Sequence, residues 1–225
     1  MISLFLKSLI FACLLSLAPY AVRAETPTEQ QASQNLPEYE LAARQSNYQG
    51  DIFLLRGFAN IFSRGLDEIG DRLKAKGINA QVYHHSGWRY AARTIIANQK
   101  KYGPVPVVLI GHSLGANAII FIAERLKRYG IKVQYLVTFE PTRTLEIPSN
   151  VGVAVNYYLS NSSMGLPLKK ARGSRGSFEN KNMISIEGIG HFNIEKQPVL
   201  QQRVIEQVLI YIKPRNNKKA NLVSQ

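Results

Sequence analysis

The stretch VPVVLIGHSLGANAIIFIAERL, residues 105–126, decides the fold. Its first six residues, 105–110, are almost all apolar, which is typical of a strand buried on both faces. Its second half carries apolar side chains at helical spacing, at positions 116, 119, 120, 123 and 126. Between the two halves, Gly111-His-Ser-Leu-Gly115 matches the pattern G-x-S-x-G. The stretch therefore predicts a buried strand, a sharp turn that carries a serine, and an amphipathic helix over about 116–129.

The same alternation of apolar runs and amphipathic helices continues on both sides of this stretch. It predicts six strands, at 52–55, 78–83, 105–110, 133–139, 151–159 and 183–187, and a last helix that begins at Pro198. We therefore expect an α/β fold, a mostly parallel sheet of about six strands with helices on both faces. The segment 161–182 is long, polar and without a helical pattern. Such loops are often functional or mobile, so it is a candidate for covering or bordering a substrate site.

The N-terminal residues 1–24 have the features of a secretory signal peptide. Lys7 precedes an apolar run over 8–18, and Val22-Arg23-Ala24 offers small residues for cleavage after Ala24; an uncleaved anchor is the alternative. Cys13, the only cysteine, would leave with this segment, so the mature chain would have neither a disulfide nor a thiolate nucleophile. We expect a bacterial periplasmic or secreted protein.

The remaining chain divides into a flexible polar leader at 25–47, one domain at 48–213, and a basic flexible tail at 214–225. A chain of 225 residues is long enough for one substantial core and too short for two domains. Its net charge of +13 becomes +11 without the signal, which favours anionic surfaces such as lipid headgroups or acidic polymers. Solvated basic loops explain the same excess. No basic stripe with interleaved aromatic residues indicates nucleic-acid binding, and we expect a monomer.

The chemistry of a nucleophilic serine requires this kind of turn. A sharp strand-to-helix connection exposes Ser113 above the sheet edge, while Gly111 and Gly115 keep side chains out of the crowded turn. The helix N-terminus supplies positive potential and free N–H groups, so the amide of Leu114 is a candidate oxyanion donor. The alternative is a structural turn that happens to contain serine.

The sequence Gly-His-Ser-Leu-Gly-Ala-Asn at 111–117 closely resembles the elbow of lipases and esterases of the α/β-hydrolase superfamily. The organisation is similar from Asp51 to the last helix. This resemblance implies a triad in the chain order serine, acid, histidine. It also places Leu-Leu-Arg-Gly-Phe-Ala, 54–59, where the family has a His-Gly turn, so the amide of Phe58 would be the second oxyanion donor. Arg56 stands in place of the family's histidine.

The chain has four histidines, and His191 is the candidate base. His112 lies within the elbow and points away from Ser113, and the pair His84-His85 precedes the elbow in sequence. His191 follows the last predicted strand, where the family places its base, and flanking glycines would let its loop bend over the serine. An imidazole, with a pKa of about 6.5, can accept and return the serine proton. An ordinary surface histidine is the alternative.

The family's chain order implies that the acid is a glutamate, because no aspartate lies between Ser113 and His191. Glu140 directly follows the strand at 133–139, and Pro141 after it predicts an extended backbone. This layout resembles that of lipases whose acid follows the sixth family strand. Glu140 is therefore the candidate acid that orients the imidazole, and Glu179, in the long loop, is the runner-up.

Other signals are weaker. Trp88, after the second predicted strand, is a candidate pocket residue or a core residue. Arg56 could bind an anionic part of the substrate or pair with Glu68 or Glu140. The sequence has no phosphate-binding glycine loop, no HExxH and no Cys/His cluster, so we expect no metal and no cofactor.

Together these features predict an exported serine hydrolase that cleaves a small-molecule or lipid ester or thioester through an acyl-serine intermediate. Three alternatives stay open at this point. The same scaffold could transfer the acyl group instead of hydrolysing it, or it could serve as a binding module without catalysis. The chain could also act as a basic binder of polyanions or membrane surfaces.

Overall fold

The computed structural model describes residues 48–58 and 63–214. The predicted signal peptide 1–24, the leader 25–47 and the tail beyond Pro214 lie outside the described residues. The main feature is a six-stranded sheet in the order β3-β2-β4-β5-β7-β9, in which every neighbouring pair is parallel. Its strands are β2 (Asp51–Arg56), β3 (Ala80–His84), β4 (Val107–His112), β5 (Val133–Phe139), β7 (Val151–Tyr158) and β9 (Ser177–Asn182). The predicted α/β class is confirmed.

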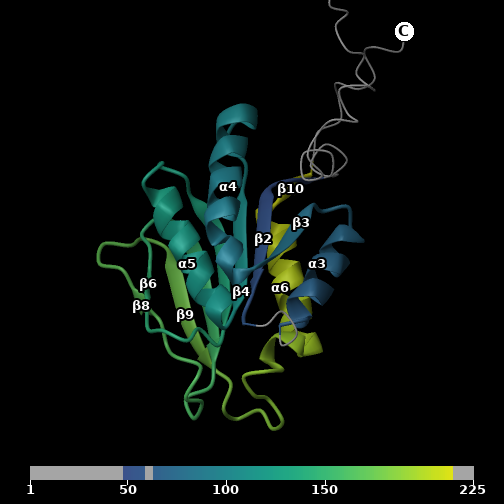
Figure 1. Ribbon diagram of the computed structural model, residues 1–225, viewed down its shortest axis with the longest axis vertical. Helices are drawn as coiled ribbons and strands as arrows, with labels where there is room; N and C mark the ends of the chain where they lie inside the picture. The colour runs from purple at the N-terminus through teal and green to yellow at the C-terminus, as the bar shows by residue number, and fades with distance from the viewer. Residues whose placement is uncertain (1–47, 59–62, 215–225) are drawn as a thin grey trace, which may run out of the picture. The chain divides into compact units, whose positions relative to one another are not determined.

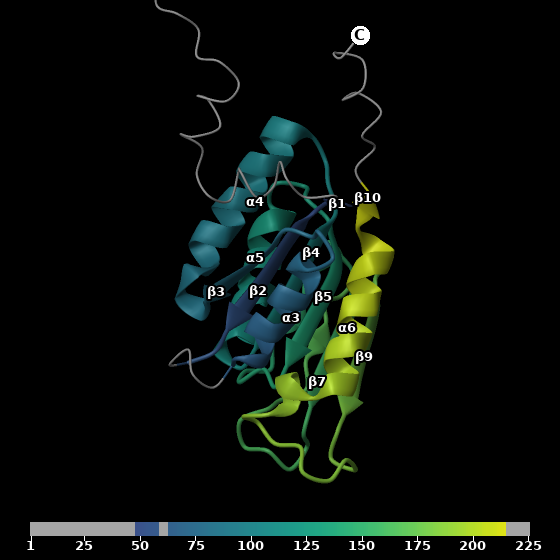
Figure 2. The ribbon, with the colours of Figure 1, turned by 90° about the vertical axis from the view of Figure 1, so that its right-hand side faces the viewer.

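Helices cover both faces of this sheet. Figures 1 and 2 show α4 (Trp88–Tyr102) and α5 (Leu114–Lys127) on one face, with α3 (Gly65–Lys74) and α6 (Pro198–Tyr211) on the other. The division follows from the two-residue period of a strand. In β2, Ile52 and Leu54 pack into the cluster that includes α3 and α6, whereas Phe53 and Leu55 pack into the cluster that includes α4 and α5. Among the described residues, no helix combines the length and apolarity needed to cross a membrane.

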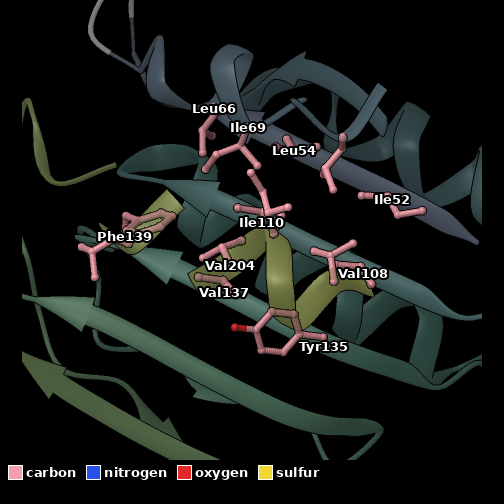
Figure 3. Packing of buried hydrophobic residues seen from close by; sticks show 14 of the residues in the cluster. Ile52, Leu54, Leu66, Ile69, Val108, Ile110, Tyr135, Val137, Phe139 and Val204 are labelled. Atoms are coloured by element: carbon pink, nitrogen blue, oxygen red, sulfur yellow. The ribbon is translucent and has the colours of Figure 1, made fainter. Parts of the chain in front are cut away.

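The core beneath α3 and α6 is continuous across three strands. Figure 3 shows side chains of β2, β4 and β5 that face Val204 of α6 and Leu66 and Ile69 of α3. Each of these helix residues is fully buried. Burial of a side chain of this size contributes about 1.5–3 kcal/mol. The central strands are therefore a firm support for the loops that leave their ends.

Smaller elements complete the described chain. Short strands β1 (Tyr48–Gln49) and β10 (Lys213–Pro214) pair antiparallel, so Pro214, which we assigned to the tail, belongs to a strand. Short strands β6 (Glu146–Ile147) and β8 (Lys169–Lys170) pair parallel. The 3₁₀ turn η1 (His85–Gly87) follows β3, and the 3₁₀ turn η2 (Ile194–Lys196) precedes α6.

The prediction of a sixth strand at 183–187 is wrong. Those residues form turns, and the sixth strand is β9, inside the segment 161–182 that we expected to be a loop. β9 lies at the edge of the sheet, and Phe178 is its only apolar residue. Its Asn180 side chain instead donates to the backbone oxygen of Leu168 and accepts from the amide of the same residue. Backbone pairing with β7 and the side-chain bonds of Asn180 hold this strand, with Phe178 as its one apolar contact, so hydrophobic periodicity could not detect it.

The strand order reverses between β2 and β4, because β3 lies outside β2 although it precedes β4 in the chain. In parallel sheets of this kind, ligands bind outside the carboxyl ends of the strands at the point of reversal. Gly57 follows β2 there, and Ser113 follows β4. The topology thus brings both predicted halves of the oxyanion site to one edge.

Candidate active site

Ser113 occupies a sharp turn between β4 and α5. Its backbone has φ 56° and ψ −123°, a conformation that is uncommon for any residue except glycine and is often retained at functional sites. A Cβ at Gly115 would lie 1.9 Å from the Leu55 oxygen, and a Cβ at Gly111 would lie 2.5 Å from the Gly115 oxygen. Only glycine fits these two positions, which is the packing that the G-x-S-x-G pattern requires.

Ser113, His191 and Glu140 form a row of hydrogen-bonded side chains. The Ser113 Oγ lies 3.1 Å from His191 Nε2, and His191 Nδ1 lies 3.2 Å from Glu140 Oε2. All three residues are buried, and Glu140 is fully so. The structure therefore brings together the three residues that sequence reasoning selected, from the ends of β4 and β5 and from the segment before α6.

A compact turn presents His191. The amide of Gly190 donates to Asn193 Oδ1 at 2.7 Å, and Asn193 Nδ2 donates to the Gly188 oxygen at 2.9 Å. Gly188 has φ 76°, which explains the glycine at this position. Sequence reasoning missed the role of Asn193, although asparagine near glycines is a common turn signal.

The candidate acid, Glu140, has an unexpected backbone conformation. Glu140 has φ 50°, so the extended conformation predicted from Pro141 is wrong. The residue before a proline usually prefers an extended backbone, and a positive φ in a residue other than glycine is uncommon and persists where the surrounding contacts hold it. The Glu140 amide donates to the Tyr157 oxygen at 2.8 Å, which continues the pairing of β5 with β7 by one residue. Its Oε1 accepts from the Leu159 amide at 2.6 Å, so the carboxylate is fixed at both oxygens.

Part of the segment 161–182 covers this acid. A Cβ at Gly165 would lie 1.8 Å from Glu140 Oε1, and the Leu166 amide donates to the Pro141 oxygen at 2.9 Å. Gly165 is a site residue that sequence reasoning missed. The runner-up acid, Glu179, lies in β9, where its side chain is 60% exposed and forms an ion pair with Lys181. The structure does not bring Glu179 to His191.

The segments that carry the two predicted oxyanion donors flank Ser113. Leu114 is the first residue of α5. A Cβ at Gly57 would lie 2.9 Å from the Ser113 Cβ, so the backbone that leads into Phe58 passes directly beside the serine. The Phe58 side chain points into solvent with 69% of its surface exposed.

Two further candidates have other partners. Arg56 forms an ion pair with Asp67 of α3, with Nη1 3.3 Å from Oδ1, instead of the pairing with Glu68 or Glu140 that was one of its two possible roles. Trp88 begins α4, and its ring packs against Phe121 of α5 at 5.8 Å between centroids. Those contacts belong to the helical layer and do not involve the triad.

Two buried titratable groups lie behind His191. Burial and the nearby His191 lower the pKa of His112 to about 3. Burial raises the pKa of the Glu195 carboxyl to about 7, against the opposing effect of backbone amides and of Lys196. Sequence reasoning placed His112 in the elbow but assigned it no role, and it missed Glu195. No group of three or more potential metal ligands occurs within the part of the chain that the structure describes.

No protein-family model and no curated protein matches this sequence. Similar solved structures include a protein from Xanthomonas campestris pv. campestris that is described as a hydrolase of the alpha/beta superfamily. It is 15% identical, the match covers 72% of this chain and 99% of that chain, and the TM-score is 0.42. The type II thioesterase BorB from the borrelidin biosynthetic cluster is 14% identical over 69% of this chain and 91% of that chain, with a TM-score of 0.44.

The thioesterase domain SrfTE, described for the cyclization of the lipopeptide antibiotic surfactin, is 12% identical. The match covers 71% of this chain and 90% of that chain, with a TM-score of 0.41. At such identities and TM-scores these likenesses assign no activity to this chain, whose own side-chain geometry is the basis for its function.

Proposed function

We propose that this protein is a serine hydrolase that cleaves an ester or thioester through an acyl-serine intermediate. The observation that carries the proposal is the buried row Ser113–His191–Glu140, with 3.1 Å between Oγ and Nε2 and 3.2 Å between Nδ1 and Oε2. A nucleophile, a base and an orienting acid at these spacings are the minimal set for acyl transfer to serine.

The proposed reaction has two halves. In the first, Ser113 Oγ attacks the carbonyl carbon while His191 Nε2 accepts its proton, and Glu140 stabilises the imidazolium that forms. The amides of Leu114 and Phe58 hold the oxyanion. His191 then gives the proton to the departing alcohol or thiol. In the second half, water attacks the acyl-serine with the same base, and the acid product leaves with Ser113 restored.

Exposed apolar side chains around the triad support an apolar acyl group. Gly57 lies against Ser113 and Gly165 lies against Glu140, and next to each of these glycines, and next to His191, the sequence places an exposed apolar residue. Phe58 follows Gly57, Met164 precedes Gly165, and Phe192 follows His191, with exposed fractions from 38% to 69%. Exposed apolar groups that form one patch commonly mark contact with an apolar ligand. Ile184 and Ile186, in the turns before His191, are also exposed.

The place of action belongs to the same proposal. The features of residues 1–24 support export to the periplasm or the medium. Sequencing the N-terminus of protein recovered from the periplasmic fraction tests this. A mature chain that begins at Glu25 is expected, and retention of Met1 in the cytoplasm would contradict export.

The first experiment is labelling of the mature protein with a fluorophosphonate probe. Wild type is expected to form one adduct, and Ser113→Ala is expected to form none. Ser149→Ala, an exposed serine at the opposite end of the sheet, is the matched control and should label as wild type does. Folded wild-type protein without an adduct would contradict a serine hydrolase and favour a binding module on this scaffold. A series of p-nitrophenyl esters of increasing chain length then identifies the acyl group.

A further inference from the structure

A chain of three buried hydrogen bonds runs behind the triad, and His112 lies at its centre. The Gly57 amide lies 2.9 Å from Ser63 Oγ, and Ser63 Oγ lies 2.8 Å from His112 Nδ1. On the other side of the ring, His112 Nε2 lies 2.7 Å from the backbone oxygen of His191. His112 and Ser63 are each 1% exposed, so no solvent competes for these bonds.

The chemistry of the partners fixes where the protons are. A carbonyl oxygen can only accept, so His112 Nε2 must carry a proton and donate it to His191. In the neutral ring Nδ1 is then the acceptor, and the Ser63 hydroxyl donates to it. The Ser63 oxygen keeps a lone pair for the Gly57 amide. Every donor and acceptor in the chain is satisfied by one arrangement of protons, in which the imidazole is neutral.

The two ends of this chain belong to two segments that the proposed reaction uses. Gly57 lies beside Ser113 and directly precedes Phe58, the predicted oxyanion donor, and the His191 backbone carries the base. We propose that His112 is a positioning residue that holds the backbone of the base to the loop that carries the second oxyanion donor, with Ser63 as the link. This inference rests on the proposed function, because it assigns His112 a role in that same site. A displacement of about 1 Å between such groups can reduce a reaction rate about 100-fold.

The surroundings keep His112 in this form. The groups that face its ring are His191, Ser63, the Glu195 carboxyl with Oε2 3.8 Å from Nε2, and more remotely Lys196. Burial and the charges of His191 and Lys196 all lower the pKa of His112, which the hydrogen bond to the His191 oxygen only partly opposes. The ring thus stays neutral while His191 gains and loses its proton.

Two substitutions separate the two bonds of His112. In His112→Asn, the amide can replace Nδ1 and accept from Ser63, but nothing reaches the His191 oxygen. In His112→Gln, the longer side chain can place its N–H₂ near the position of Nε2 and donate to that oxygen. Thr138→Val is the matched control, because it removes another buried side-chain hydrogen bond, from Thr138 Oγ1 to Asn156 Oδ1, in the neighbouring strand.

The experiment combines ¹⁵N NMR of the histidine rings with the rate of fluorophosphonate labelling. In wild type, His112 should show the Nε2–H tautomer and should not titrate between pH 5 and pH 8. His112→Asn should move the ¹⁵N resonances of the His191 ring and slow labelling about 10- to 100-fold, and His112→Gln should recover most of the rate. Thr138→Val should change neither quantity, even if its melting temperature falls.

Two results would overturn the inference. One is titration of His112 within that pH range, or the Nδ1–H tautomer. The other is a His112→Asn protein in which the ¹⁵N resonances of the His191 ring and, where wild type labels, the labelling rate equal those of wild type. The NMR measurement needs no turnover. If wild type fails to label, the proposed function fails, while the spectra still decide whether His112 holds the His191 backbone.

Discussion

Replacing Glu140 with glutamine tests the triad most sharply. The side chain keeps its size, and its Oε1 can still accept from the Leu159 amide, which lies 2.6 Å away. At the other position, however, an N–H₂ group replaces the oxygen 3.2 Å from His191 Nδ1. An amide there donates, so Nδ1 must become an acceptor and the ring proton moves to Nε2. The imidazole then presents a proton to Ser113 and cannot take the one that Oγ must lose.

The size of the effect follows from the geometry. When His191 becomes an imidazolium, it faces a full negative charge 3.2 Å away in a buried setting, with side-chain exposures of 7% and 0%. Coulomb's law with an effective dielectric of about 20 gives about 5 kcal/mol for such a pair. Since about 1.4 kcal/mol corresponds to a tenfold change in rate, Glu140→Gln should lose about 10³- to 10⁴-fold in kcat. The corresponding aspartate-to-asparagine change in a serine-protease triad lowers kcat about 10⁴-fold.

The assay is the rate of acyl-serine formation, with circular dichroism as the check on folding. Glu179→Gln is the matched control, because it removes the runner-up carboxylate from an exposed position in β9. We expect that control to retain wild-type activity. A folded Glu140→Gln protein within tenfold of the wild-type rate would refute the reasoning, and so would an equal loss in Glu179→Gln.

Three further outcomes are expected. Gly165→Ala should lower activity more than tenfold, because the new Cβ would lie 1.8 Å from the Glu140 carboxylate. Gly190→Ala is its control and should be as active as wild type in the same assay, because a Cβ at that position has no neighbour within 4 Å. Glu195→Gln should stabilise the fold by roughly 2–3 kcal/mol more at pH 8 than at pH 5 in urea unfolding. The sign follows because a carboxyl with a folded-state pKa of about 7 destabilises the fold as pH rises above its ordinary value of 4.5, and an equal gain at both pH values would contradict it. Phe192→Ser should lower kcat/KM about fivefold for long-chain esters and leave kcat/KM for acetate esters unchanged, because its exposed ring would contact a long acyl chain. Val199→Ser, at an exposed position of α6, should change kcat/KM for neither class of ester. An equal loss of kcat/KM for acetate esters in Phe192→Ser would exclude a contact with the acyl chain.

Hydrophobic periodicity and motif spacing were sufficient to predict the secondary structure wherever the chain is apolar and its pattern is regular. The central strands β4 and β5 and the helix α5 bury most of their side chains, and α6 buries one face, so the pattern of these sequences directly reflects the core. The serine-bearing turn at 111–115 could be predicted for a related reason. Its glycines are required by contacts with neighbouring backbone, and those contacts exist only when a strand precedes the serine and a helix follows it.

What the sequence could not reveal depends on polar contacts between remote segments. β9 is held by its pairing with β7 and by the Asn180 side chain, and the cover over the acid depends on Gly165, which lies 25 positions from Glu140. Ser63 lies 49 residues from the His112 ring that it bonds. Hydrogen bonds of this kind leave no period in a sequence. Their residue types, asparagine, glycine and serine, are also those of ordinary loops.

The neutrality of His112 has a consequence for the rate itself. The ring centroids of His112 and His191 lie 5.0 Å apart. If His112 were charged when His191 became an imidazolium, the repulsion at an effective dielectric of about 20 would be about 3 kcal/mol, which is more than a hundredfold in rate. A side chain that donates to the His191 oxygen without carrying charge avoids this cost, which a lysine or arginine at the same place could not do. A buried, neutral histidine behind the base therefore combines positional control with electrostatic tolerance of the charged intermediate.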